Sequence, residues 1–162
     1  MYYGKLESSS ISSGPGCRVA LFVSGCEHRC KNCHNPETWC FTYGEKFTEE
    51  ILTVLLKLSE PSYISGLSIM GGEPLHPRNR EEVLKLTRRF KKAYPEKTVW
   101  LWTGYLIEDV FEDLVDSRID VVVDGQFKED LKDLRLKYRG SSNQRVIDLK
   151  ETIRTGDLTL IE

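Results

Sequence analysis

The sequence lacks a hydrophobic run long enough to cross a membrane, and its first residues lack the apolar centre of a secretory signal. Its longest apolar run, 19–23, has the length of a strand, whereas a membrane-spanning helix needs about 20 apolar residues. The opening residues MYYGKLESSS contain no apolar segment of the signal-peptide kind. We therefore expect no membrane association and a cytoplasmic location.

The sequence also lacks a large excess of charge of either sign. The 23 Lys and Arg residues are nearly balanced by 25 Asp and Glu residues, which gives a net charge of −2. A nucleic-acid-binding domain usually shows a strongly basic face. The one basic run, 88–92, falls late in a predicted helix, where cations suit the negative end of the helix dipole. The composition therefore predicts no nucleic-acid partner.

The five cysteines do not form an even set, and three of them crowd into residues 26–33. A disulfide framework normally uses an even number of cysteines spread along the chain. Metal or cluster binding in a reducing compartment is the better interpretation.

Short apolar segments alternate with segments of helical period. The strand-like segments are 17–24, 65–70, 98–103 and 119–124. Helical patterns follow Thr48 and Asn79, both interpreted as N-caps, and begin again at Ile107. Strands that alternate with helices predict βα units and a mainly parallel sheet. Because a complete eight-fold barrel usually needs about 250 residues, we expect an α/β fold in the form of a partial, open βα barrel.

No composition shift, internal repeat or low-complexity segment divides the chain. The 162 residues, 40% of them hydrophobic, are enough for one hydrophobic core. We expect 1–162 to be a single domain, with a core at about 15–125 and a polar tail, 126–162, packed on it.

The segment CEHRCKNC, 26–33, directly follows the first predicted strand and has the spacing C-x3-C-x2-C. Thiolates are soft ligands that select iron–sulfur clusters or zinc. Three cysteines can hold three irons of a 4Fe–4S cluster and leave the fourth iron open to a small molecule. A structural zinc site, with His28 or His34 as fourth ligand, and unligated thiols are the alternatives. Cys17 is expected to be buried, and Cys40 to be buried or inert, a fourth ligand, or a redox partner.

A second motif, GGEP at 71–74, follows the second predicted strand. Glycines allow a ligand to approach the backbone closely, and parallel strands bind ligands at their carboxyl ends. With the cysteine spacing, this motif resembles the radical S-adenosylmethionine (SAM) superfamily. The resemblance implies a partial barrel of the radical SAM type, in which the amino and carboxylate groups of SAM chelate the open iron and the 71–74 segment receives the methionine end.

Further segments are similar to the activating proteins of anaerobic ribonucleoside-triphosphate reductase. The similar segments cover nearly the whole chain and are 14–30, Asn35, Thr38 with Trp39, 68–79, 99–105, 121–127 and 138–145. This resemblance implies a radical SAM activase that cleaves SAM reductively and generates a glycyl radical on the reductase, its protein partner. It also implies a flavodoxin- or ferredoxin-like electron donor.

The resemblance also implies the residues of the site. The cluster ligands would be Cys26, Cys30 and Cys33, with no catalytic residue beyond the cluster and SAM. The SAM contacts would be Asn32, Cys33, His34, Gly71, Gly72 and Glu73, although Glu73 could act more by shaping the turn. The chain departs from the family at Asn32, where many superfamily members carry an aromatic residue, and at His34, where related activating proteins often carry tyrosine.

Three other functions have weaker support. They are an activase of another glycyl-radical enzyme such as pyruvate formate-lyase, a 7-carboxy-7-deazaguanine synthase, and a non-catalytic zinc-binding module. The tail segment 139–145 has two interpretations: a charged docking site for the reductase, or a tight turn held by its own polar side chains.

Overall fold

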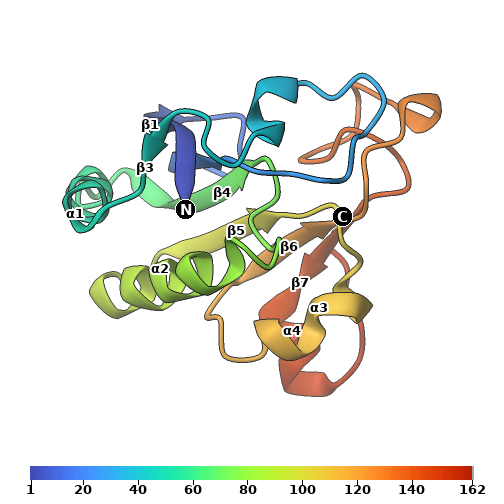
Figure 1. Ribbon diagram of the computed structural model, residues 1–162. Helices are drawn as coiled ribbons and strands as arrows, with labels where there is room; N and C mark the ends of the chain where they lie inside the picture. The colour runs from blue at the N-terminus through green and yellow to red at the C-terminus, as the bar shows by residue number, and fades with distance from the viewer. Residues whose placement is uncertain (162) are drawn as a thin grey trace.

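The computed structural model describes residues 1–161 (Figure 1). In chain order the elements of this part are β1 (Tyr2–Ser10), β2 (Cys17–Val23), the 3-10 helix η1 (Pro36–Trp39), β3 (Glu45–Lys46), α1 (Glu49–Leu58), β4 (Ile64–Gly71), α2 (Arg80–Ala93), β5 (Thr98–Trp102), α3 (Ile107–Leu114), β6 (Val121–Asp124), the 3-10 helix η2 (Glu129–Leu131), β7 (Arg145–Asp148) and α4 (Leu149–Thr155). None of the helices in residues 1–161 combines the length and hydropathy needed to cross a membrane.

The strands of residues 1–161 form one seven-stranded sheet in the order β3-β1-β2-β4-β5-β6-β7. Strands β2, β4, β5 and β6 run parallel, whereas β1, β3 and β7 run antiparallel to their neighbours. Three of the six pairings in this part of the chain are therefore antiparallel. The prediction of a mainly parallel, open βα barrel of the radical SAM type is wrong, and the architecture is an α/β fold with a mixed sheet.

The error arises at the two ends of the sheet. Strand β1 buries only Tyr3 and Ser10 fully, so it has no apolar run that periodicity could detect, and the tail strand β7 is only four residues long. Local periodicity identifies a strand but not its partner. An antiparallel neighbour needs only a loop, whereas a parallel one needs a crossover helix. The alternation of strands and helices therefore predicted the parallel strands in the middle of the sheet but not the antiparallel strands on its two sides.

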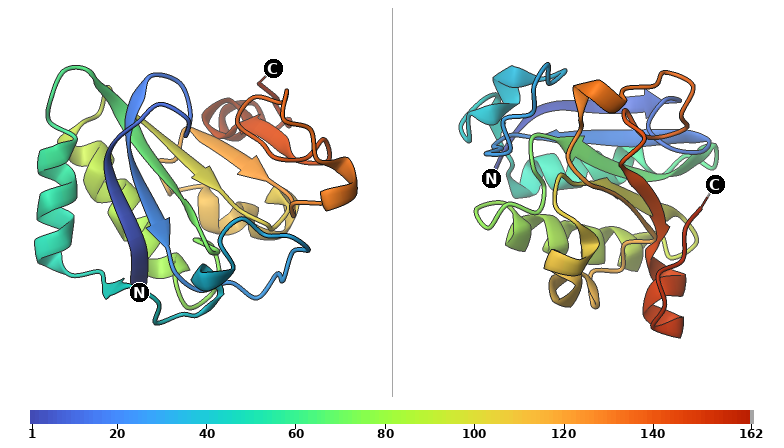
Figure 2. Two further views of the ribbon diagram at one scale, coloured as in Figure 1. Left: turned by 90° about the horizontal axis from the view of Figure 1, so that it is seen from above. Right: turned by 90° about the vertical axis from the view of Figure 1, so that its right-hand side faces the viewer.

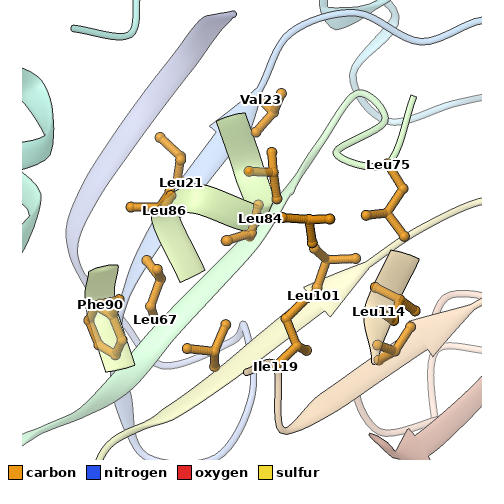
Figure 3. Packing of buried hydrophobic residues seen from close by; sticks show 14 of the residues in the cluster. Leu21, Val23, Leu67, Leu75, Leu84, Leu86, Phe90, Leu101, Leu114 and Ile119 are labelled. Carbon is orange, nitrogen blue, oxygen red and sulfur yellow. The ribbon is translucent and has the colours of Figure 1, made fainter. Parts of the chain in front are cut away.

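The main hydrophobic core lies between the helices and one face of the sheet. On β5, Val99 and Leu101 belong to this core, while Trp100 and Trp102 point to the opposite face, as the two-residue period of a strand requires. Phe90 of α2 packs over the strands with no exposed surface (Figure 3). The helices predicted after Thr48, after Asn79 and from Ile107 are confirmed as α1, α2 and α3.

One predicted N-cap is confirmed and the other is wrong. The Thr48 side chain accepts a hydrogen bond from the Ile51 backbone at 3.4 Å, at the start of α1. Asn79 makes no side-chain cap. Its Nδ2 atom instead donates to the carbonyl oxygens of Ser24 (3.0 Å) and Glu73 (3.1 Å). Asn79 therefore ties together the two loops that follow β2 and β4.

The carboxyl ends of the parallel strands lie together and form the carboxyl edge of the sheet. The loops 24–44, 72–79, 103–106 and 125–144 leave the strands at this edge. Figures 1 and 2 show the 126–144 segment (orange) at the same end of the sheet as the loop after β2 (blue to teal). This edge holds the residues that both sequence motifs singled out.

The tail loop 126–144 is closed at its base by a partly buried ion pair. Arg145 donates from Nε to Oδ1 of Asp124 at 2.9 Å and from Nη1 to Oε1 of Glu108 at 3.0 Å. Asp124 is fully buried and also accepts from the backbone N–H of Ile107 at 2.8 Å. The two carboxylates raise the pKa of Arg145. At Arg145 the contacts therefore support the structural interpretation of the 139–145 segment over the docking interpretation.

Replacing Arg145 is expected to destabilise the fold. Arg145→Ala leaves the buried Asp124 carboxylate without its cation and should lower the free energy of unfolding by about 3 kcal/mol, measured by denaturant unfolding of the metal-free protein. Arg135→Ala is the matched control, because Arg135 is 90% exposed and pairs with Asp133 of its own loop. Equal stability of the two variants would restore the docking interpretation for Arg145.

Candidate functional site

Three thiols face one cavity at the carboxyl edge of the sheet. Cys26, Cys30 and Cys33 all line a cavity of about 460 Å³, a size typical of small-molecule and cofactor sites. Cys26 is 8% exposed, and the other two are half-buried. The structure thus brings together the three cysteines that the spacing predicted to act as one set.

The loop that carries the cysteines closes back on η1. The backbone N–H of Gly25 donates to the carbonyl oxygen of Thr38 at 2.6 Å, and that of Cys26 donates to Trp39 at 3.2 Å. Gly25 has a φ of 107°, which glycine adopts without steric cost. These contacts fix the direction in which the loop leaves β2, and so aim the first cysteine at the cavity.

Burial disfavours the thiolate form of Cys26 and Cys30, so both keep their protons more readily than a free cysteine. Burial raises the pKa of Cys26 to about 11. Burial, and then the neighbouring Cys33, raise the pKa of Cys30, which a hydrogen bond from the Phe127 backbone partly offsets. Because the thiolate is the metal ligand, binding of a soft metal must release these protons.

The donor chemistry fits an iron–sulfur cluster, since three thiols lie at one cavity and each can bind its own iron. Within residues 1–161, no three His, Cys, Asp or Glu side chains are grouped closely enough to hold a single metal ion.

Gly71 and Gly72 form another part of the cavity lining. Gly71 has a φ of 111°. A Cβ atom added to Gly72 would lie 2.7 Å from the carbonyl oxygen of Gly25 and 2.8 Å from that of Thr38. Glycine is therefore required at position 72, because the backbones of Gly25 and Thr38 approach it closely. The sequence predicted a close approach of a ligand at this turn, but not of the protein's own backbone.

Two of the predicted SAM contacts are not among the residues that line the cavity. Cys33, His34, Gly71 and Gly72 are among its lining residues, but Asn32 and Glu73 are not. Asn32 is exposed and has a φ of 57°.

Glu73 is fully buried, and its carboxylate is surrounded by protein donors. Its Oε1 atom lies 2.7 Å from His28 Nε2 and accepts from the Gly104 backbone at 2.7 Å. Its Oε2 atom accepts from the Leu75 backbone at 2.9 Å and from the Thr103 hydroxyl at 2.8 Å. This agrees with the interpretation of Glu73 as a residue that shapes the turn.

The remaining wall of the cavity was not predicted. It comes from the end of β5 and from the tail, with Trp102, Phe127, Tyr138, Arg139 and Gln144 among its residues. Trp102 donates from Nε1 to the carbonyl oxygen of Tyr138 at 2.6 Å, and the ring of Phe127 lies 5.7 Å from that of His34. The sequence held one signal for this wall, the aromatic residue Trp102 at the carboxyl end of a strand. The folding of the tail over Trp102 is a tertiary contact and leaves no local pattern.

The two other cysteines do not line the cavity. Cys17 begins β2, with its sulfur 3.0 Å from the Ser9 hydroxyl. Cys40 is exposed rather than buried, and hydrogen bonds from Thr42 lower its pKa.

The comparisons with known proteins support an iron–sulfur cluster as the cofactor. The chain matches, over residues 12–147, the family described as a 4Fe-4S single cluster domain. Its curated relatives include three anaerobic ribonucleoside-triphosphate reductase-activating proteins. That of Enterobacteria phage T4 is 42% identical over 146 residues, which covers 90% of this chain and 93% of the relative. That of Escherichia coli K12 is 41% identical over 154 residues, covering 93% and 100%, and that of Vibrio cholerae is 41% identical over 152 residues, covering 89% and 96%.

The chain belongs to the 4Fe-4S single cluster domain family and, within it, to the anaerobic ribonucleoside-triphosphate reductase-activating proteins. The family predicted from the sequence is thereby confirmed.

Replacing Gly72 is expected to disturb the protein before any ligand binds. Gly72→Ala places a methyl group against two backbone carbonyl groups and should lower the free energy of unfolding of the metal-free protein by about 1–3 kcal/mol. The control is Gly4→Ala, whose methyl group would lie 2.9 Å from the movable ring of Tyr43 and 3.8 Å from the Ser24 hydroxyl, both of them side chains. Thermal unfolding of both variants checks this, and an unchanged Gly72→Ala protein would contradict the close approach of the two loops.

Proposed function

We propose that this protein is a radical SAM activase that generates the glycyl radical of an anaerobic ribonucleoside-triphosphate reductase. One observation carries the proposal: the three thiols of the C-x3-C-x2-C loop and the Gly-Gly turn line the same cavity. The names of the curated relatives support the choice of the reductase as the protein substrate.

In this proposal Cys26, Cys30 and Cys33 each bind one iron of a 4Fe–4S cluster and leave the fourth iron to SAM. When bound, the reduced cluster supplies the electron that cleaves SAM to methionine and a 5′-deoxyadenosyl radical. His34, Gly71 and Gly72, which line the cavity beside the thiols, are the proposed SAM contacts.

The aromatic wall has a protective role in this proposal. Trp102, Phe127 and Tyr138 line the cavity together with polar and glycine residues. Large apolar side chains keep water away from a reactive intermediate and so limit side reactions. The tail loop is thus proposed to shield the hydrogen transfer as well as to complete the fold.

The proposed partners follow from the same chemistry. A low-potential flavodoxin- or ferredoxin-like protein would reduce the cluster, and the reductase would present the glycine that loses a hydrogen atom. We propose that both encounters occur at the carboxyl edge of the sheet, because the cysteine loop lies there.

The ligand set is tested by anaerobic reconstitution. The wild-type protein should hold about four iron and four sulfide per chain, measured by chemical analysis and by bleaching of the visible absorption on reduction. Cys26→Ala, Cys30→Ala and Cys33→Ala should each lose the cluster. Cys17→Ala and Cys40→Ala are matched controls and should keep it, since neither residue lines the cavity.

Stoichiometric zinc without iron in protein kept free of oxygen would refute the cluster. Loss of the cluster in Cys40→Ala would instead show a fourth protein ligand and leave no open iron for SAM.

The activity is tested with the reductase itself. The reconstituted protein, SAM and a reductant should produce a glycyl-radical signal on the reductase by electron paramagnetic resonance, together with free methionine. Cys33→Ala should give neither product. Formation of methionine without a radical on the reductase would support the cleavage of SAM but refute the reductase as the protein substrate.

A further inference from the structure

We propose that His28 is a positioning residue, which fixes the cysteine loop (26–33) on the ends of the parallel strands through the buried carboxylate of Glu73. The proposal rests on the proposed function only in taking the three cysteines of this loop as cluster ligands. It gives Glu73 a role that acts through His28 instead of through contact with SAM.

The cysteine loop needs support from outside itself. Two of its residues that are not glycine, Arg29 and Asn32, have φ values of 56° and 57°. This left-handed region is unfavourable for a residue with a side chain and persists where surrounding contacts hold it. Both side chains are exposed, and the Arg29 guanidinium lies over the Trp39 ring at 4.7 Å, so contacts that join the loop to the ends of the strands must come from its other residues.

His28 provides such contacts on both sides of its ring. Its Nε2 atom lies 2.7 Å from Oε1 of Glu73, and its Nδ1 atom lies 3.2 Å from the amide nitrogen of Gln126. Because a carboxylate only accepts hydrogen bonds, Nε2 donates, and Nδ1 accepts from the Gln126 amide. A residue between the first two cysteines is thereby tied to the segments that follow β4 and β6.

The ring also occupies a space that fits it closely. A Cβ atom on Gly104 would come within 2.6 Å of the imidazole. The Tyr105 ring meets His28 edge-on, with centroids 4.8 Å apart. The end of β5 therefore touches the ring as well, and lateral movement of His28 is restricted.

Glu73 transmits this restraint to the sheet. The Gly104 backbone, the Leu75 backbone and the Thr103 hydroxyl donate to its two oxygens at 2.7–2.9 Å. The side chain has no exposed surface, and hydrogen bonds to an ionised group are strong where water is excluded. The His28 ring thus donates to a carboxylate whose position is already fixed by three other hydrogen bonds.

His76 provides a natural comparison. It also contacts the cysteine loop, with Nε2 3.1 Å from Oε2 of Glu27, but the Glu27 side chain is 69% exposed. An ion pair whose carboxylate is largely exposed restrains the loop little, and the buried His76 ring is held by its own turn, where the Arg78 backbone N–H donates to Nδ1 at 3.1 Å. His76 is therefore a matched control for a histidine that touches the loop without anchoring it.

The test uses the full-length, metal-free protein and amide hydrogen exchange. Peptides that cover 26–34 contain the hydrogen-bonded amides of Cys26 and Cys33. In His28→Phe these peptides should exchange about tenfold faster, because two hydrogen bonds are lost while an aromatic ring remains. His28→Gln, whose amide can still donate to Glu73, should recover part of the protection. His76→Phe should match the wild type, and β4 and β5 should be unchanged in all three variants.

A second readout uses the reconstituted protein. The electron paramagnetic resonance spectrum of the reduced cluster should change in His28→Phe, return towards the wild type in His28→Gln and stay unchanged in His76→Phe. Wild-type exchange in His28→Phe overturns the proposal, and so does faster exchange throughout the molecule, which would make His28 a general stability residue. Failure of the wild type to bind iron would refute the proposed function but leave the exchange result unaffected.

Discussion

The buried carboxylate of Glu73, which has no access to water, determines how the carboxyl edge of the sheet is assembled. A buried charge is tolerated only when its oxygens are fully hydrogen-bonded, and Glu73 meets this condition with donors from its own turn, from the end of β5 and from the cysteine loop. No one of these segments can satisfy the charge alone. The carboxylate therefore makes their assembly cooperative: the turn after β4, the residues after β5 and the thiol-bearing loop must be in place together.

Much of the local structure could be predicted, because burial of one face leaves a period in the sequence. Strand β2, the Thr48 cap and the apolar face of α2 all followed from such patterns. The type of sheet could not be predicted this way, since pairing is a property of two distant segments. Strand β1 was missed because its sequence is largely polar. Asn79 was misread as a cap because its side chain bonds to Ser24, 55 residues away, and to Glu73 in the preceding turn.

The site was predictable where chemistry is local and unpredictable where it depends on tertiary contact. Three cysteines within eight residues can act as one ligand set whatever the surrounding fold, and they do line one cavity. The Gly-Gly turn was also found, although the steric reason for Gly72 became visible only with Gly25 and Thr38 beside it. Of the aromatic wall only Trp102, at the carboxyl end of a strand, left a signal, because the rest of the wall exists only after the tail has folded over the end of β5.

The tail loop that forms this wall begins and ends on neighbouring strands, where Asp124 and Arg145 are direct partners in the sheet. Its two ends are held by that pairing whatever lies between them, and doubling the length of a flexible loop costs only about 0.6 kcal/mol in closure entropy. The segment between the anchors can therefore change in length at little cost in free energy while the register of the sheet is kept.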